Sequence, residues 1–207
     1  MPRNRQTVPR ERRVAELVTA AGRLFLERGY SATTMAQIAR AAEVTPTTLY
    51  WYFPSKDHAF VAVLERLLAE EQARIQGRPE LRDDPVARLL AVLRDLEAYP
   101  GLQPVVHERA PKAPVVAEFH DRLHGWLDGL LADALRHRLP DEQERALAAQ
   151  AVAAMLDGAL GHNPGNRPLT EVVGFVLARI APGGAGADPG GRPAPTRSGP
   201  AVPDPGR

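Results

Sequence analysis

The chain has 207 residues, of which 44% are hydrophobic and 25% charged, as in ordinary globular proteins. This length makes one or two domains and is enough to bury a hydrophobic core. Because there is no cysteine, disulfide scaffolds, thiolate metal sites, iron–sulfur clusters and cysteine nucleophiles are excluded. The first residues are polar and basic, unlike a secretory signal, and no apolar run approaches the roughly 20 residues that span a bilayer. We therefore expect a cytoplasmic protein with no membrane partner.

Charge is unevenly distributed along the chain. The formal net charge is +1, but residues 1–60 hold nine basic and five acidic residues, which leaves +4 there and −3 in the remainder. A basic N-terminal segment on a mildly acidic body indicates an end that binds a polyanion. A solvated basic tail would give the same pattern, so charge alone leaves both interpretations open.

The N-terminal third shows helical periodicity interrupted by strong capping signals. The first apolar stripe comprises Val14, Leu17, Val18, Ala21, Leu24 and Phe25. Gly29 supplies its predicted stop. Thr34 to Gln37 has the pattern of a capping box that opens a second helix. Thr45 followed by Pro46 predicts the start of a third helix.

The third helix is predicted to be short and to end near Tyr52, because Pro54 disfavours helical backbone before it. Ser55 is the predicted cap of a fourth, long helix that ends near Gln76.

The remainder also favours helices. Asp84 and Pro85 predict the start of one helix, and longer helices are expected over about 115–138, 141–160 and 170–181, the last capped by Thr170. The piece at 102–107 stays undecided because a proline interrupts it. No sustained strand alternation is visible, so the predicted fold is all-α.

This pattern predicts four segments. A basic, flexible arm over 1–9 precedes an N-terminal domain of three helices over 10–70. A C-terminal helical bundle over 78–181 follows. The segment 182–207, with seven prolines and seven glycines, is predicted to be a disordered tail.

The segment 33–53 carries the chemistry. Two helices joined by a short turn form a helix-turn-helix, whose second helix enters the major groove of DNA. Thr47 and Thr48 have short hydroxyls that let the backbone approach base edges, and Tyr50 and Tyr52 have phenols that reach phosphates. Lys56 opens the next helix, where a cation and free N–H groups favour a phosphate. An ordinary helical hairpin is the alternative.

The ordered run from Gly29-Tyr30 through Ile38-Ala39 and Leu49-Tyr50-x-Tyr52-Phe53 to Ser55-Lys56 closely resembles the DNA-binding domain of tetracycline-repressor-like (TetR family) regulators. The resemblance covers about residues 10–70. It implies a homodimeric, ligand-responsive repressor that binds a palindromic double-stranded DNA operator. It also implies DNA contacts at Thr34, Thr45, Pro46, Thr47, Thr48, Tyr50, Tyr52 and Lys56.

Two positions depart from the family pattern. Glu43 occupies a turn position that usually holds glycine, so a positive φ there would strain it. Trp51 stands where many members have His or Tyr. We include Trp51 among the candidate DNA contacts, although we favour a partly buried position for it.

The C-terminal half does not identify its ligand. The resemblance places effector pockets among the helices over about 85–138, which gives six candidate ligand-binding residues: Tyr99, Val106, His107, Phe119, Leu123 and Trp126. Phe119, Leu123 and Trp126 belong to an apolar stripe, which is more often part of a hydrophobic core than of a ligand site. Small residues in 141–160, together with the helix that follows, resemble the dimerisation element of the family.

Other functions have weaker support. His120 and His124 are spaced i, i+4 on one helix, but two ligands do not make a site, so a polar helix face is favoured and neither a metal nor a cofactor is expected. No catalytic motif is present, and we expect no enzyme activity. A small α-helical enzyme and a nucleic-acid-binding module without a sensor remain as alternatives, the second weakened by the size of the C-terminal half.

Overall fold

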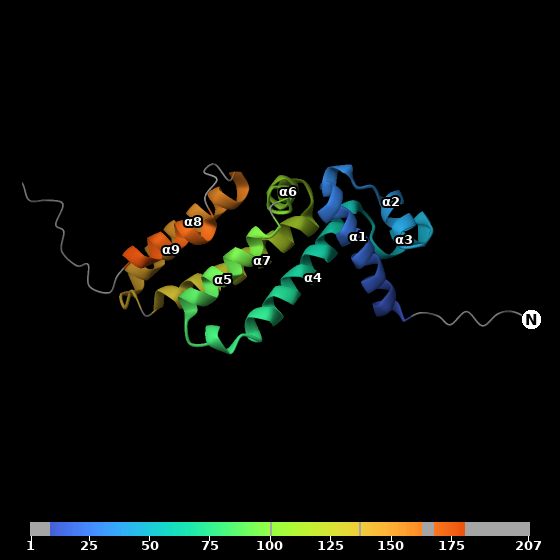
Figure 1. Ribbon diagram of the computed structural model, residues 1–207. Helices are drawn as coiled ribbons and strands as arrows, with labels where there is room; N and C mark the ends of the chain where they lie inside the picture. Colours follow the sequence, from blue (N-terminus) through green and yellow to red (C-terminus); the bar gives the residue numbers. More distant parts are fainter. Residues whose placement is uncertain (1–8, 100, 137, 163–167, 181–207) are drawn as a thin grey trace, which may run out of the picture.

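The computed structural model describes residues 9–99, 101–136, 138–162 and 168–180, and all regular structure within these ranges is helical (Figure 1). The all-α fold class predicted from the sequence is therefore confirmed. The arm predicted over 1–9, apart from Pro9, and the tail predicted over 182–207 lie outside the described residues. Within the described helices, none combines the length and apolar character needed to cross a membrane.

The helices form two groups joined by one long helix. The N-terminal group comprises α1 (Arg10–Ala32), α2 (Met35–Ala41) and α3 (Pro46–Tyr52). Helix α4 (Lys56–Gln76) runs from this group into the second group, where it lies beside α7 and α5 (Figure 1). The second group comprises α5 (Pro85–Glu97), α6 (Gln103–Arg109), α7 (Pro114–Arg136), α8 (Glu142–His162) and α9 (Leu169–Arg179), with short 3-10 turns η1 (Pro79–Leu81) and η2 (Ala110–Lys112).

The helix starts follow the predicted caps. The Thr34 hydroxyl accepts the N–H of Gln37 at 3.2 Å, and the Gln37 side chain accepts the N–H of Thr34 at 2.8 Å, which completes the capping box. Thr45, Ser55 and Asp84 likewise accept a backbone N–H from the first turns of α3, α4 and α5. Each cap stabilises the fold by about 1 kcal/mol. The two partners of each capping hydrogen bond lie three residues apart in the sequence.

Two predicted boundaries differ from the structure, and one segment that the sequence left undecided forms a helix. Gly29 (φ 79°, ψ 165°) kinks α1 rather than ending it, and one more turn continues to Ala32. Thr170 does not cap α9, since the helix begins at Leu169 with Pro168 in the capping position. The undecided segment forms α6, because Pro104 lies in the first turn, where a missing N–H costs nothing.

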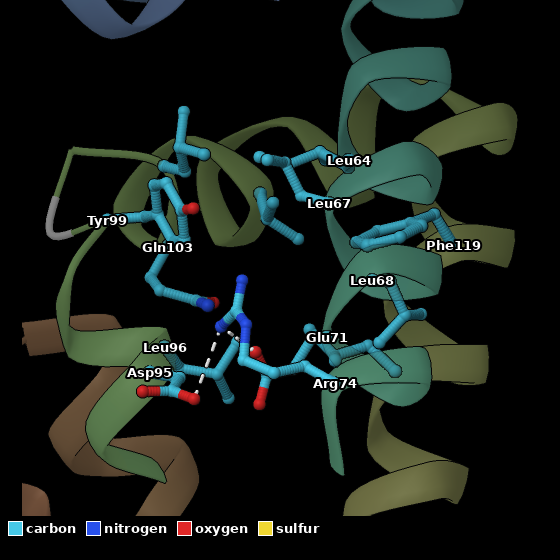
Figure 2. A pocket seen from close by; sticks show the side chains of 13 residues that line it. Leu64, Leu67, Leu68, Glu71, Arg74, Asp95, Leu96, Tyr99, Gln103 and Phe119 are labelled. Atoms are coloured by element: carbon cyan, nitrogen blue, oxygen red, sulfur yellow. Dashed lines mark hydrogen bonds and ion pairs between the residues drawn. The ribbon is translucent and has the colours of Figure 1, made fainter. Parts of the chain in front are cut away.

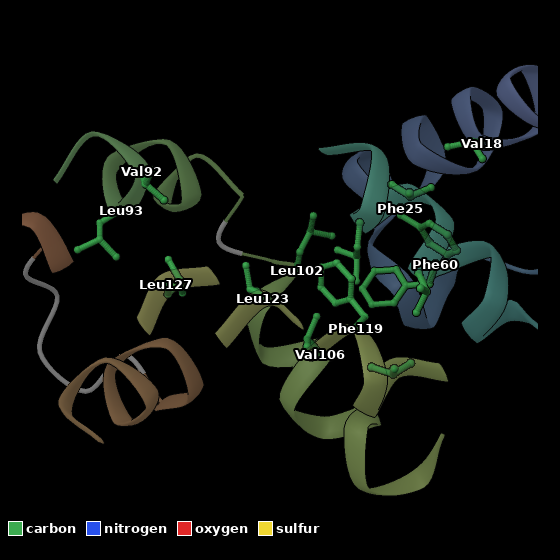
Figure 3. Packing of buried hydrophobic residues seen from close by; sticks show 14 of the residues in the cluster. Val18, Phe25, Phe60, Val92, Leu93, Leu102, Val106, Phe119, Leu123 and Leu127 are labelled. Carbon is green, nitrogen blue, oxygen red and sulfur yellow. The ribbon is translucent and has the colours of Figure 1, made fainter. Parts of the chain in front are cut away.

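The hydrophobic core runs through both groups (Figure 3). At the N-terminal end, the rings of Phe25, Tyr30 and Phe60 pack together with centroids 5.0–5.9 Å apart. Helix α4 packs against α1 there and against α5 and α7 further along. A single rigid element therefore contributes to the cores of both groups.

Candidate DNA-binding surface and ligand pocket

A tight turn connects α2 to α3. The Val44 N–H donates to the Ala39 carbonyl at 2.9 Å, and the Glu43 N–H donates to the Arg40 carbonyl at 3.1 Å. Glu43 has φ 55°, so the positive φ considered for this position is present. A left-handed conformation costs a residue with a Cβ roughly 1–2 kcal/mol. The turn thus sets the direction of α3 relative to α2, at a cost in backbone conformational energy at Glu43.

Helix α3 is anchored on one side and exposed on the other. Leu49 is fully buried, whereas Tyr50 is 51% exposed and Trp51 68% exposed. The expectation that Trp51 would be partly buried is therefore wrong. Its ring meets Tyr52 edge-on, with centroids 4.7 Å apart, and lies 5.5 Å from the Arg10 guanidinium. Two exposed aromatic rings on a seven-residue helix form a surface suited to a partner.

The other predicted contacts of this surface lie beside α3. Thr34, Thr45, Pro46 and Thr47 are exposed, while Thr48 is half-buried with its hydroxyl 2.9 Å from that of Thr45. Tyr52 is also half-buried. The structure thus brings these positions together at one end of the molecule. Their contacts with DNA stay predictions.

Lys56 has internal partners that the sequence did not indicate. Its Nζ donates to the carbonyls of Tyr30 at 3.0 Å and Thr33 at 3.1 Å, and it lies 4.1 Å from the centroid of the Tyr30 ring. Burial lowers the pKa of Lys56. The ammonium group therefore joins the end of α1 to the start of α4. A phosphate contact through its third N–H stays a prediction.

An ion pair connects α6 to the start of α4. Asp57 accepts hydrogen bonds from Arg109 Nε at 3.0 Å and Nη2 at 2.7 Å, and from the Tyr30 hydroxyl at 2.6 Å. The Arg109 guanidinium holds the pKa of Asp57 below its ordinary value, against an opposing effect of burial. Burial and the Asp57 carboxylate raise the pKa of Tyr30. The sequence-based reasoning missed this network, because its members are 27 and 52 residues apart.

A pocket lies among α4, α5, α6 and α7 (Figure 2). It contains about 550 Å³ of space free of atoms, part of it open to solvent. Most of its wall is apolar and includes Leu64, Leu67, Leu68, Phe119 and Leu123. Because these walls lie close together, the enclosed cavity is only about 40 Å³. A ligand larger than a few waters therefore requires the side chains of the wall, or the helices that carry them, to move apart.

One end of the pocket is polar. Arg74 donates hydrogen bonds to Glu71 and to Asp95 (Figure 2). Burial raises the pKa of Glu71, and the neighbouring carboxylate of Asp95 raises it further. Among the described residues, Glu71 Oε1 and Gln103 Oε1 are buried without a hydrogen-bond partner. Buried acceptors without donors are costly, so this end is suited to a ligand that donates hydrogen bonds.

Four of the six predicted pocket residues line this pocket: Tyr99, Val106, Phe119 and Leu123. Trp126 lines a different, shallower hollow beside Gln72 and Gly125. His107 lies in neither, and instead meets His120 and His124. The pocket residues that the sequence missed lie mainly on α4, which the sequence analysis did not consider as a wall of the pocket.

Apolar side chains are also exposed on α8 and α9. Leu147, Ala151, Ala154 and Gly158 are exposed at helical spacing along α8, and Phe175 is exposed on α9 with the Arg179 guanidinium 3.6 Å from its ring centroid. Helix α9 packs on α5 through its opposite side, where Val173 and Leu177 are buried. The two helices thus present an apolar surface, which we name the α8–α9 face.

Comparison with known proteins agrees with this arrangement. The model of the tetR family of bacterial regulatory proteins matches residues 17–63. The probable HTH-type transcriptional regulator ArpR of Pseudomonas putida is 29% identical over 164 residues, which is 71% of this chain and 78% of ArpR. The HTH-type transcriptional repressor KstR of Rhodococcus jostii is 29% identical over 144 residues, which is 67% of this chain and 66% of KstR.

A solved structure shows the same fold over most of the chain. FadR of Thermus thermophilus, a TetR family repressor in complex with lauroyl-CoA, aligns with a TM-score of 0.58 and 24% identity, covering 81% of this chain and 92% of FadR. Residues 17–63 are therefore similar to the tetR family of bacterial transcriptional regulators, and most of the chain shares the fold of a TetR family repressor. The matched relatives ArpR and KstR are named as regulators of transcription.

Proposed function

We propose that this chain is a repressor that binds a palindromic operator as a homodimer, and that a small molecule in the pocket releases it from DNA. The observation that carries the proposal is the position of α4. Its first turn is joined to the end of α1 and to α6 through Lys56 and Asp57, and its middle forms one wall of the pocket.

The DNA-binding part of the proposal rests on the exposed face of α3. In a helix-turn-helix dimer, two such helices enter successive major grooves about 34–36 Å apart, so the operator mirrors the two-fold symmetry of the protein. The hydroxyl of Thr47 and the ring of Tyr50 are the exposed groups best placed to meet bases and backbone. Because its partner is operator DNA, the protein would act in the cytoplasm on the nucleoid.

The pocket favours a particular kind of effector. An apolar or aromatic body would replace contacts among the leucines of the wall, while an amine or hydroxyl would donate to Glu71 and Gln103 at the polar end. The lauroyl-CoA of FadR also has a long apolar chain, but its anionic groups would meet carboxylates here. We therefore propose a neutral or cationic amphiphile.

The narrowness of the pocket explains how such a ligand would affect DNA binding. To enter, it must move α4 away from α5, α6 or α7, and it therefore favours a conformation with a different placement of the recognition helices. The effect on operator affinity equals the difference between the ligand affinities of the two conformations.

The α8–α9 face supports the homodimer. Two copies of this face, related by a two-fold axis, would form a four-helix interface in which small residues let the backbones approach. The exposed rings of Phe175 and the side chains of Leu147 would be buried in this interface.

The experiment is a selection of genomic fragments with the purified protein at two salt concentrations. We expect an enriched palindrome whose affinity falls steeply with salt, because phosphate contacts release counterions. The selected site is then titrated in the presence of candidate amphiphiles, and release by one of them supports the sensor role. Failure to enrich any sequence at either salt concentration contradicts the assignment of α3 as a recognition helix.

A further inference from the structure

Three histidines from two helices meet beside the pocket. His107 lies on α6, and His120 and His124 lie one turn apart on α7. Their ring centroids are 5.1 Å (His107–His120), 6.1 Å (His107–His124) and 4.1 Å (His120–His124) apart. One ring nitrogen from each lies within 4.8 Å of the other two, and all three residues are half-buried.

The hydrogen bonding of His107 directs a lone pair into this cluster. Its Nδ1 lies 2.9 Å from the backbone carbonyl of Gln103. A carbonyl can only accept, so Nδ1 carries the proton and Nε2 of the neutral ring is left with a lone pair. Within the described part of the chain, this Nε2 is buried and has no hydrogen-bond partner. A donor or a cation at this position would remove the cost of the unpaired group.

Imidazole nitrogens held in this way are typical ligands of transition metals. A backbone carbonyl or a carboxylate that fixes the other ring nitrogen is the usual second partner of a metal-bound histidine. Here Gln103 provides the carbonyl for His107, and an Asp121 oxygen lies 3.5 Å from His120 Nδ1. Three imidazoles suit Zn²⁺ or its neighbours better than the oxygen-seeking Mg²⁺ or Ca²⁺.

We propose that His107, His120 and His124 bind one Zn²⁺ ion, with a fourth coordination position left for water or a ligand. Tetrahedral bonds of about 2.0–2.1 Å separate ligand nitrogens by about 3.3 Å. The nitrogens of this cluster lie within 4.8 Å, so rotation of the rings suffices to close the site. The ion would join α6 to α7.

The place of this site in the fold gives it a regulatory role. One turn before His107, the side chain of Gln103 lines the pocket, and two residues after it Arg109 holds Asp57 at the start of α4. A metal that fixes α6 on α7 therefore restrains the helix that lies between the pocket and the DNA-binding end. This role rests on the proposed function, whereas metal binding itself does not.

The test is calorimetric titration of Zn²⁺ into the full-length, tag-free protein after removal of metal with a chelator. We expect one equivalent to bind with micromolar or tighter affinity, a higher Tm with Zn²⁺, and the visible absorption of tetrahedral Co²⁺ when cobalt is used instead. Operator binding is measured separately, so loss of DNA recognition cannot be mistaken for loss of the metal site.

The variants His107→Ala and His120→Ala should each weaken binding at least 100-fold and abolish the cobalt spectrum. The control is His58→Ala, which removes an exposed histidine at the start of α4 and should leave binding unchanged. Circular dichroism checks that each variant is folded, and His120→Ala serves as the test if His107→Ala does not fold. Absence of saturable binding, or equal binding by the parent and a folded cluster variant, would overturn the proposal.

Discussion

The ion pair between Arg109 and Asp57 allows a sharp test of how α6 is attached to the DNA-binding end. We consider the substitution Arg109→Ala, which removes both hydrogen bonds to the Asp57 carboxylate, of 3.0 and 2.7 Å. Asp57 keeps its bond from the Tyr30 hydroxyl. The carboxylate therefore loses the cation that is hydrogen-bonded to it, while Lys56 remains nearby.

The expected cost follows from the burial of the pair. Exposed ion pairs contribute up to about 1 kcal/mol, and removal of one member of a buried pair costs about 3–5 kcal/mol. The side chains of Asp57 and Arg109 are 13% and 25% exposed, which places this pair between the two cases. We expect a loss of about 2 kcal/mol, or roughly 4–8 °C in Tm for a chain of this size.

The effect depends on pH in a defined direction. Because the pKa of Asp57 is lowered in the folded state, its contribution is complete above the unfolded value of about 4 and is lost as the pH falls through the lowered pKa. The difference in stability between parent and variant should thus be constant from pH 5 to pH 8 and should shrink below about pH 4.

Urea denaturation followed by circular dichroism at pH 7 and at pH 3.5 measures both quantities. The control is Lys112→Ala, which breaks an exposed pair with Glu108 and should cost less than about 0.5 kcal/mol. An Arg109→Ala variant as stable as this control would refute the reasoning, as would a destabilisation that is the same at both pH values.

Three further predictions concern the turn, the recognition helix and the dimer. Glu43→Gly should raise stability by about 0.5–1 kcal/mol because it relieves a positive φ, whereas Gly29→Ala should lower it by about 1–3 kcal/mol, with Tm as the readout. Tyr50→Ala should weaken operator binding at least tenfold in fluorescence anisotropy and leave the dimer intact. The control Leu26→Ala, which alters an exposed side chain of α1, should leave operator binding unchanged. Leu147→Glu should shift the protein toward monomers in analytical ultracentrifugation, and an unchanged dimer would exclude the α8–α9 face.

The sequence predicted the helix starts well because their signals are local. The side chains of Thr34, Thr45 and Ser55 accept hydrogen bonds from residues only three positions away. The same local logic failed at Thr170, where helix α9 begins earlier. There the N–H of Leu169 donates to the carboxylate of Glu97 at the end of α5, so a side chain from another helix replaces the local cap.

The candidate site could be predicted only in part, because its partners are far apart in the sequence. Lys56 was expected to face a phosphate, yet its carbonyl partners lie 23 and 26 residues earlier in the chain. His120 and His124 were visible as a pair, but His107 joins them from another helix. Periodicity also marks apolar stripes without separating a core from the wall of a pocket, so the leucines of α4 escaped notice.

The length of α4 explains why a tight pocket can control DNA binding. At 1.5 Å per residue, Glu71 in the pocket lies about 20 Å along the helix from Asp57 at the DNA-binding end. A shift of about 1 Å at Glu71 about that end tilts the helix by roughly 3°, and two protomers add their tilts. In the proposed dimer, both recognition helices must fit grooves about 34–36 Å apart, so a ligand that widens the pocket would weaken binding without touching α3. A ligand that fits the narrow and the widened pocket equally well would leave operator affinity unchanged, however tightly it binds.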